Sequence, residues 1–444
     1  MYLYNIKYEK KMYRIRFNDL IKWKMSSKRK PLLFLGARQV GKTYLLKQFG
    51  DAEYKQVAYV NFEHPSAPKG LFDIDFDVDR IITVLNAFCN IKINSEDTLI
   101  VFDEIQAAPK GIMALKYFFE DAPKYHIVAA GSLLGVNIHP GESFPVGKVD
   151  FMRLYPLSFY EFILAMGEKG IAEIYMNGDF SNLKFFHDKL INYLRYYFYV
   201  GGMPEVVVDF VENRDWQSVR KLQKQILESY RNDFSKHAPR EILPRINMVW
   251  DSIPAQLSKE NKKFVYGVIR EGSRAKDFEL AIQWLTDAGL LQKIYNTSKA
   301  ALPLVAYQEL SAFKLFHNDV GLLGAMSNLS AQTIANGDAI FTEFKGALAE
   351  QFVFQQLIKE ENISVYYHTF ENSKYELDFL VQTSDDEIIP IEVKAGENLK
   401  STSFRLFCKK HNPKIAIRTS LTEYKIESWL TNIPLYCIDR CILG

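Results

Sequence analysis

The sequence predicts an α/β fold, because short apolar runs alternate with stretches long enough to form helices. Four such runs, typical of strands buried on both faces, lie at residues 31–35, 57–60, 98–102 and 126–130. Helical crossovers between buried strands are the pattern of a doubly wound parallel sheet. We therefore expect residues 1–165 to form such a sheet, braced by a short N-terminal helix.

Beyond residue 165 the alternation of apolar runs and helices stops, and the sequence predicts three further regions. Residues 166–240 are mainly helical, with a long amphipathic stretch at 216–234, and predict a helical lid. Within 241–340, a helix over 277–289 ends at glycine and precedes a strand, which is how a winged helix enters its wing. Residues 341–444 predict a separate small α/β domain. Its expected elements are a helix at 344–359 and strands at 363–367, 376–382 and 388–393.

Composition and charge narrow the class of protein. The chain has 444 residues, with 55 Lys and Arg against 53 Asp and Glu, a formal net charge of +2, so overall charge does not indicate a binder of nucleic acid or membranes. It holds no apolar run of the ~18 residues that cross a bilayer, and Met1–Arg16 lacks the core of a signal peptide. Its four cysteines fall in no metal-ligand spacing. We expect a globular cytoplasmic protein with reduced thiols.

A phosphate-binding loop is the most specific motif. Residues 36–43 match every fixed position of the P-loop pattern and stand between a buried strand and a helix. Glycines let backbone N–H groups curl around a phosphate, Lys42 neutralises the β and γ oxygens, and Thr43 ligates Mg²⁺. The alternative is a glycine-rich turn without a ligand, but a turn alone does not need Lys-Thr at a helix start. The predicted nucleotide-binding residues are Gly36, Ala37, Arg38, Gln39, Val40, Gly41, Lys42 and Thr43.

Acidic and polar residues end two further strands of the predicted sheet. Asp103 and Glu104 follow the third apolar run, in the pattern of a Walker B strand. Asp103 is expected to hold Mg²⁺ through Thr43 and water, and Glu104 to polarise the attacking water; a solvated loop acid is the alternative for Glu104. Ser132 follows the fourth run, either as a sensor of the γ-phosphate or as a helix N-cap.

With several further motifs, these residues resemble the prokaryotic AAA-type ATPases that carry a C-terminal nuclease-like domain. The resemblance covers nearly the whole chain and implies ATP and Mg²⁺ as ligands. It also implies a restriction-endonuclease-like fold for residues 341–444. The motifs that carry it lie at residues 36–43, 102–106, 131–132, 155–162, 201–206, 319–323, 346–350 and 391–394.

Two details of the resemblance bear on function. Arg38 and Arg153 are both candidates for an arginine finger, and the sequence does not choose between them. Where the family is expected to have Gly-Arg before its Pro-Leu-Ser-Phe segment, this chain has Gly147-Lys148, and a lysine lacks the planar fork of arginine. For the Gly-Gly-Met-Pro segment at 201–204 we prefer a structural interpretation, a helix end followed by a turn.

Acids and a lysine converge in the predicted C-terminal domain. Asp378 lies in an alternating strand, and fourteen positions later Glu392 and Lys394 lie two apart, on one face of a strand. Two carboxylates and a lysine on adjacent strands form the core of restriction-endonuclease-like sites, where the acids hold Mg²⁺ and the lysine assists water. Glu350, on the preceding helix, matches the auxiliary acid of that fold. The cluster is an active nuclease site, an inert relative of one, or a strand with alternating surface charges.

Local charge favours contact with a phosphate backbone. Between Arg220 and Lys276 there are 13 basic and 6 acidic residues, a net charge of +7. Between Lys394 and Lys425 there are 8 basic and 2 acidic residues, a net charge of +6. Such basic stretches suit nucleic acid, although solvated helix faces or a basic lid over the nucleotide explain them equally well.

The sequence therefore predicts an Mg²⁺-dependent AAA-type ATPase coupled to a nuclease-like, DNA-interacting C-terminal domain. The alternative is a nucleotide-switched scaffold whose nuclease-like domain is inactive and docks a partner protein. Expected ligands are ATP, Mg²⁺ and a second divalent metal; expected partners are DNA, a protein or a second copy of the chain, but no membrane. Catalytic roles are predicted for Lys42, Glu104, Ser132, Asp378, Glu392 and Lys394, and metal ligation for Thr43, Asp103, Glu350, Asp378 and Glu392.

Overall fold

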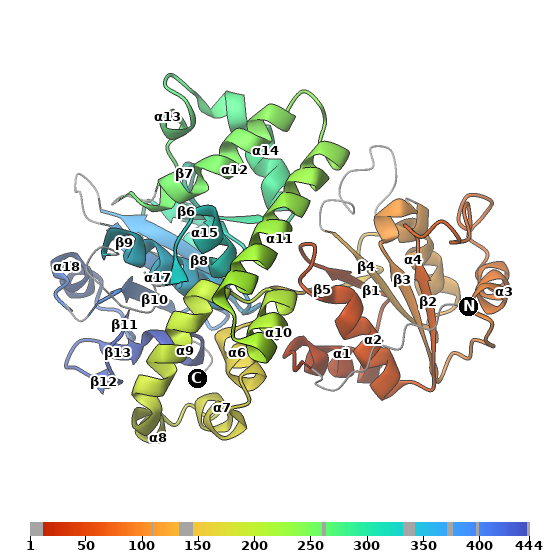
Figure 1. The fold of residues 1–444 in the computed structure, drawn as a ribbon, viewed down its shortest axis with the longest axis horizontal. Coiled ribbons are helices and arrows are strands. Elements are labelled where there is room, and N and C mark those ends of the chain that lie inside the picture. The colour runs from red at the N-terminus through yellow and green to blue at the C-terminus, as the bar shows by residue number, and fades with distance from the viewer. Residues whose placement is uncertain are drawn as a thin grey trace. The chain divides into compact units, whose positions relative to one another are not determined.

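The computed structural model describes residues 12–108, 110–132, 145–259, 263–331, 342–370, 376–396 and 399–441. It divides into two compact units, which Figure 1 colours from red to orange and from yellow to blue. The first unit comprises residues up to Leu154 except 37–39, together with Leu164–Gly167, and the second comprises the rest. Among the described residues, no helix is both long and apolar enough to cross a membrane.

The first unit is built on a five-stranded parallel sheet with the order β2-β3-β4-β1-β5. Every residue of β1, β3 and β4 is buried, as expected for strands covered on both faces. The strands are β1 (Leu32–Leu35), β2 (Gln56–Asn61), β3 (Thr98–Asp103), β4 (His126–Gly131) and β5 (Asp150–Arg153). The first four correspond to the four apolar runs, so the predicted parallel α/β sheet is confirmed.

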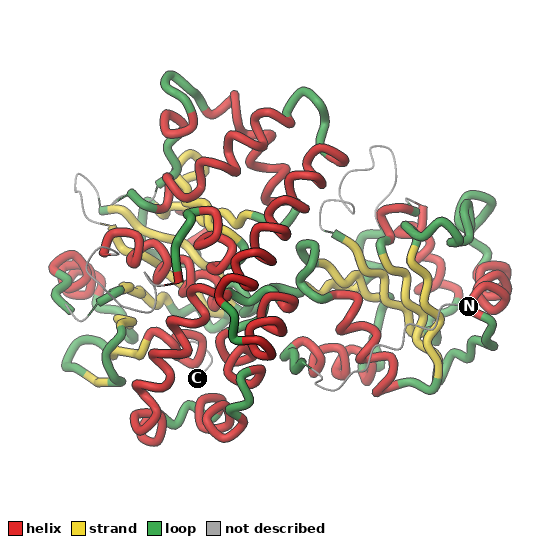
Figure 2. The backbone as a smooth tube through the Cα atoms, in the orientation of Figure 1, coloured by secondary structure: helices red, strands yellow, loops and turns green. Residues whose placement is uncertain are grey.

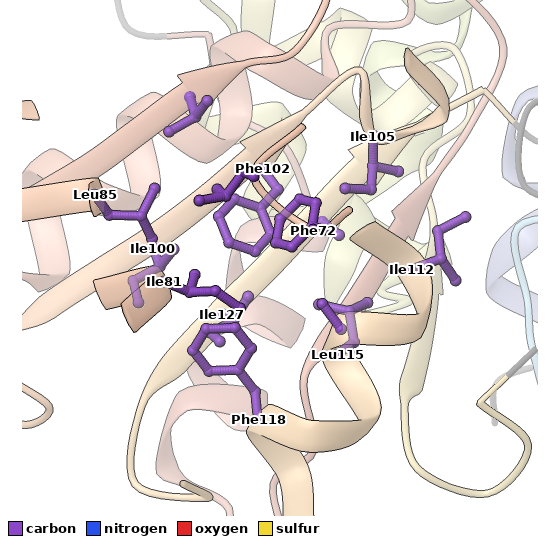
Figure 3. Close-up of a cluster of buried hydrophobic side chains, with 14 of the residues drawn as sticks. Phe72, Ile81, Leu85, Ile100, Phe102, Ile105, Ile112, Leu115, Phe118 and Ile127 are labelled. Carbon is purple, nitrogen blue, oxygen red and sulfur yellow. The ribbon is translucent and has the colours of Figure 1, made fainter. Parts of the chain in front are cut away.

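Helices cover both faces of this sheet. Alternate strand residues, such as Ile100 and Phe102, pack with α3 and α4 in one hydrophobic cluster (Figure 3). The intervening strand residues point to the other face, where α2 contacts β2 and β3, and α1 contacts α2. These elements are α1 (Arg16–Met25), α2 (Lys42–Glu53), α3 (Val78–Cys89), the 3₁₀ turn η1 (Ile105–Ala107) and α4 (Lys110–Asp121).

The second unit contains an eight-stranded mixed sheet with the order β12-β13-β11-β10-β9-β8-β6-β7. The hairpin β6–β7, in the region predicted as a winged helix, belongs to this sheet because β6 pairs in parallel with β8. β8, β9 and β10 form an antiparallel meander, and β11 then pairs in parallel with β10. The strands are β6 (Leu291–Thr297), β7 (Gln308–His317), β8 (Ile363–Thr369), β9 (Glu376–Thr383), β10 (Ile388–Val393), β11 (Ile417–Ser420), β12 (Lys425–Ile426) and β13 (Thr431–Pro434).

Helices surround this sheet in the second unit (Figure 2); most of them precede it in the chain, and α15, α17 and α18 connect its strands. α12 contacts α14 and β7, whereas α17 contacts β7 and β10, and α18 contacts β9. The helices are α6 (Phe159–Ala165), α7 (Lys169–Met176), α8 (Phe180–Leu183), α9 (His187–Val200), α10 (Pro204–Asn213), α11 (Trp216–His237), α12 (Leu243–Leu257), α13 (Tyr266–Ile269), α14 (Ala275–Asp287), α15 (Val320–Met326), α17 (Thr342–Leu357) and α18 (Thr402–His411). The 3₁₀ turns are η2 (Lys184–Phe186), η3 (Leu304–Tyr307) and η5 (Leu435–Cys441).

Candidate functional site

The P-loop connects β1 to α2 and has the backbone that its sequence requires. Gly41 precedes α2 with φ 92°, in the left-handed region that favours glycine. A Cβ on Gly36 would lie 2.4 Å from the carbonyl oxygen of Leu154, so the loop passes too close to that backbone for any larger residue. Ala37, Arg38, Gln39 and Val40 form the rest of the loop, and Gln39 also has a positive φ of 65°.

The loop presents a helix N-terminus suited to a phosphate. Gly41 gives α2 no side-chain cap, and the first turn of α2 carries no acidic residue, so the positive end of its dipole is not neutralised locally. Lys42, the first residue of α2, is only 7% exposed, and its Nζ donates to the carbonyl oxygen of Gly36 at 2.9 Å. The ammonium group is therefore already placed against the loop that would hold the phosphates.

Asp103 joins the P-loop to the end of β3. Its carboxylate is 1% exposed, and Oδ2 accepts hydrogen bonds from Thr43 Oγ1 at 2.7 Å and from the Tyr59 hydroxyl at 2.6 Å. Its Oδ1 accepts from the backbone N–H of Glu104 at 3.1 Å. The structure thus brings together Thr43 and Asp103, the two residues predicted to hold Mg²⁺ at the nucleotide.

Tyr59 is a residue that the sequence analysis missed. It lies on β2, which is hydrogen-bonded to β3, two positions before the end of the strand. Burial first, and then the adjacent Asp103, raise the pKa of the Tyr59 hydroxyl well above its usual value, so it remains a hydrogen-bond donor. The available signal was a tyrosine within a strand next to Walker B, since the hydroxyl of a buried tyrosine usually needs a polar partner.

Glu104 is held in an unusual conformation at the end of β3. Its φ of 51° and ψ of 48° are left-handed, which costs a non-glycine residue conformational free energy and often marks a functional position. The Gln106 amide donates to its carboxylate. A Cβ on Gly131 would lie 2.7 Å from Gln106 Oε1, so Gln106 also lies against the end of β4, directly before Ser132. Glu104 and Ser132 therefore follow neighbouring strands at the same edge of the sheet as the P-loop.

The two arginine-finger candidates and Lys148 occupy different places. Arg38 lies within the P-loop, and Arg153 is the exposed last residue of β5, opposite Leu35 of β1. Lys148 lies just before β5, and the first residue of β5 pairs with the first residue of β1. The Lys148 Nζ forms an ion pair with Glu120 of α4 at 3.0 Å. Lys148 therefore lies at the opposite end of the strands from the P-loop and is not placed to act on a nucleotide in this chain's own P-loop.

The predicted C-terminal acids lie on three elements of the second unit. Glu350 is on α17, Asp378 on β9 and Glu392 on β10, which pairs with β9. Asp378 Oδ2 accepts the backbone N–H of Val393 at 2.8 Å. Glu392 Oε1 accepts from Lys394 Nζ and from Ser401 Oγ, both at 2.8 Å. Lys394 is thus beside one acid, as the sequence predicts.

A buried lysine that the sequence analysis did not identify also contacts these acids. Lys314 on β7 is completely buried; its Nζ contacts Glu376 Oε1 and lies 3.7 Å from Glu350 Oε2. In the described residues, no three His, Cys, Asp or Glu side chains converge in a way that could hold a metal ion. The signal for Lys314 was a lysine inside the apolar run 312–316, because a charge that is buried there needs a partner.

The Gly201-Gly202 motif has a structural role around buried Asp319. Asp319 caps α15 by accepting the N–H of Leu322 at 3.0 Å, and it also accepts the N–H of Gly202 at 2.6 Å. A Cβ on Gly201 would lie 2.1 Å from Asp319 Oδ1. Two motifs far apart in the sequence, at 201–206 and 319–323, are therefore one packing unit.

Comparisons with known proteins match three segments of the chain. An AAA domain matches residues 28–163, a domain of unknown function (DUF8612) matches residues 191–333, and a domain of unknown function (DUF4143) matches residues 345–438. No curated protein shows significant similarity to the chain.

Several solved structures are similar at low sequence identity. The Walker-type ATPase PABY2304 of Pyrococcus abyssi is 14% identical, with 70% of this chain and 95% of that chain covered and a TM-score of 0.43. The Aeropyrum pernix ORC1 protein in complex with DNA is 14% identical, with 73% and 95% covered and a TM-score of 0.31. Cdc6p from Pyrobaculum aerophilum is 13% identical, with 73% and 96% covered and a TM-score of 0.26. The AAA-domain match, on a parallel sheet with a P-loop, supports an AAA-type P-loop ATPase domain in residues 28–163.

Proposed function

We propose that this protein is an Mg²⁺-dependent ATP hydrolase. The observation that carries the proposal is the 2.7 Å contact between Thr43 Oγ1 and Asp103 Oδ2, which joins the P-loop to the Walker B strand. A hydroxyl and a buried carboxylate next to an uncapped helix N-terminus are the oxygen ligands that Mg²⁺ takes beside nucleotide phosphates. Mg²⁺ would neutralise charge on the phosphates, and these two residues would hold it.

The other residues of the site would bind the phosphates and activate the attacking water. Lys42 neutralises the β- and γ-phosphate oxygens, and the backbone N–H groups of the loop surround the phosphates. Glu104 orients and polarises the attacking water, and Ser132, after β4, contacts the γ-phosphate. The Gln106 amide donates to one oxygen of the Glu104 carboxylate, which would orient it and leave its other lone pairs to accept a hydrogen bond from water.

The proposal is tested by separating binding from hydrolysis. Lys42→Ala should abolish useful ATP affinity in calorimetry, because it removes the point charge that the loop sets against the phosphates. Glu104→Gln should bind ATP with parental affinity and hydrolyse it at least ~100-fold more slowly, the usual scale for losing a positioned base. Parental ATP affinity in Lys42→Ala would refute the site, and parental turnover in Glu104→Gln would make Glu104 a loop acid.

For the second unit we propose a binding role on DNA rather than cleavage. Basic side chains of α11 and α18, including Lys221, Lys224, Lys409 and Lys410, are exposed and suit a phosphate backbone. The helices α12 and α14 with the hairpin β6–β7 are a winged-helix candidate in the same unit. Glu350, one of the acids predicted to hold metal, lies 3.7 Å from the buried ammonium of Lys314, a lysine outside the predicted nuclease motif, which supports a nuclease-like domain that binds without cleaving.

Nuclease activity is the second candidate, favoured by one observation. Asp378 and Glu392 are on adjacent strands, and Lys394 is 2.8 Å from Glu392, an arrangement of the restriction-endonuclease-like type. Nicking of supercoiled plasmid in the presence of Mn²⁺, lost in Glu392→Gln, would establish cleavage. Binding of the same plasmid without nicking supports the binding role.

A further inference from the structure

The ammonium group of Lys314 is buried in the interior of the second unit. Its side chain is 0% exposed, and its Nζ lies among carboxylates from two other elements: Glu350 of α17, and Glu376 at the start of β9. The side chains of these acids are 8% and 16% exposed. The same Nζ is 4.8 Å from the centre of the Tyr367 ring on β8, a cation–π distance.

The carboxylates keep this lysine charged. Burial alone disfavours an ammonium, but the Nζ contacts Glu376 Oε1 and lies 3.7 Å from Glu350 Oε2, and these carboxylates compensate its charge. A fully buried ammonium without such partners would lose its proton rather than remain charged. The cluster is therefore a set of ion pairs, and the cation at its centre belongs to the protein.

This arrangement does not fit a divalent metal held by the predicted acids. Mg²⁺ requires oxygen ligands at about 2.0–2.1 Å in octahedral geometry. Here an ammonium lies between Glu350 and Glu376, whereas Glu392 is engaged by Lys394 and Ser401, and Asp378 accepts the N–H of Val393. The glutamates therefore belong to two ion-paired groups, each with its own lysine, rather than to one set of metal ligands.

We propose that the Lys314 ammonium takes the place of a divalent cation in this cluster, which makes the second unit independent of metal. In this arrangement the cluster ties the hairpin β6–β7, through β7, to α17 and β9. This inference rests on the proposal that the second unit binds without cleaving, and deepens it. Its test uses neither DNA nor ATP, so a failure of the metal-independence inference can be told apart from a failure of the DNA-binding role or of ATP hydrolysis.

The test is Mn²⁺ binding by the full-length chain without nucleotide, measured by calorimetry. Every sample carries Asp103→Asn, so that the P-loop carboxylate contributes no site. We expect no Mn²⁺ site in this parent, and less than about 1–2 °C change in its melting temperature on adding EDTA, roughly the error of the measurement. One bound Mn²⁺ per chain that disappears on adding Asp378→Asn would overturn the proposal, whether or not the protein hydrolyses ATP.

Lys314→Met adds a second, independent readout. Removal of the ammonium takes this counter-charge away from the buried acids. The variant should therefore either gain one Mn²⁺ site, which Asp378→Asn abolishes, or have a melting temperature about 5–10 °C below that of the parent. Lys293→Met is the matched control, because Lys293 lies on neighbouring β6 with its Nζ over the Phe313 ring; it should gain no site. A Lys314→Met variant with parental stability and no Mn²⁺ site would show that the ion pairs do not hold the cluster, and would also overturn the proposal.

Discussion

At the scale of single residues, the Asp103 carboxylate, which is proposed to bind Mg²⁺, is hydrogen-bonded by a tyrosine outside both Walker motifs. Tyr59 donates to the same oxygen of Asp103 that accepts from Thr43. Two donors on one oxygen fix the direction of the carboxylate before a metal arrives, which lowers the cost of ordering it on binding.

Tyr59→Phe should therefore weaken the response to Mg²⁺ without unfolding the protein. Loss of one hydrogen bond to a carboxylate costs about 1–2 kcal/mol, so the Mg²⁺ concentration for half-maximal ATP hydrolysis should rise by about five- to thirtyfold. Turnover at saturating Mg²⁺ should stay close to that of the parent. Tyr117→Phe on α4 is the control, since the Tyr117 ring stacks on Phe76; an equal Mg²⁺ response in both variants would exclude the positioning role.

Buried His317 makes the stability of the second unit depend on pH. Burial lowers the pKa of the His317 ring to about 3, although a backbone hydrogen bond with Asp319 acts against this, so the ring is neutral in the folded protein at pH 5–7. In the unfolded chain the ring takes up a proton below its ordinary pKa of about 6.5. The unfolded state then binds more protons, so the free energy of unfolding falls as pH falls from about 6.5 towards 3.

His317→Gln should remove this part of the pH dependence. One histidine contributes about 1.4 kcal/mol per pH unit in that window, so between pH 7 and pH 5 the parent should lose ~2 kcal/mol more than the variant. Urea unfolding at the two pH values measures the difference, and comparison with the variant cancels the carboxylates that titrate in both, Asp319 among them. Equal losses in the two proteins would mean that His317 is protonated in the folded state.

The P-loop and Walker B residues could be predicted from the sequence because their roles follow from local order. Residues 36–43 lie within one turn, and Asp103 ends a recognisable apolar strand. Tyr59 and Lys314 could not be predicted in this way. Their partners are 44 residues away in the first case, across the paired strands β2 and β3, and 36 in the second, where α17 contacts β7.

At the scale of elements, α9, α10 and α15 meet at a junction with no space for a side chain. Gly201 has φ 75°, and any Cβ there would overlap Asp319, which caps α15. Burial raises the pKa of the Asp319 carboxyl, and the N–H groups of Gly202 and Leu322 act against that rise. A substitution at Gly201 would both strain the backbone and displace this cap.

Gly201→Ala should lower the free energy of unfolding by about 3 kcal/mol or more, the scale for combining backbone strain with the loss of a buried hydrogen-bond acceptor. Gly170→Ala is the matched control, because Gly170 lies in the first turn of α7 and a Cβ there meets nothing within 4 Å. That change should be neutral or stabilising by up to about 1 kcal/mol. Similar urea midpoints for the two variants would mean that the junction adapts.

Individual strands were easier to predict from the sequence than the strands with which they pair. The apolar runs at 98–102 and 126–130 specify strands because both faces of β3 and β4 are covered. A strand after Gly289 was also predicted, but nothing local shows that β6 pairs with β8, some 70 residues later. Sheet pairing over such distances depends on the packing of the whole unit.

At the scale of the whole molecule, charge is balanced overall but not locally. The net charge is +2 for 444 residues, yet the stretches 220–276 and 394–425 carry +7 and +6. A balanced protein has no general attraction to polyanions. Any affinity for DNA must therefore come from local basic stretches such as these two, which lie in the second unit, and it should depend on salt through the number of phosphates that they neutralise.

The last prediction is that DNA affinity falls with salt and that selected lysines account for the slope. Lys409→Glu with Lys410→Glu, in the last turn of α18, should reduce the slope of log K against log salt by about 0.9 for each phosphate that is no longer neutralised, about 2 in total. The control, Lys69→Glu with Lys92→Glu, makes the same charge change at two exposed positions of the first unit. Fluorescence anisotropy with a labelled duplex at several salt concentrations gives both slopes. If the two double variants lose affinity equally, net charge alone governs binding; if the parent binds no duplex even at low salt, the proposed DNA-binding role is wrong.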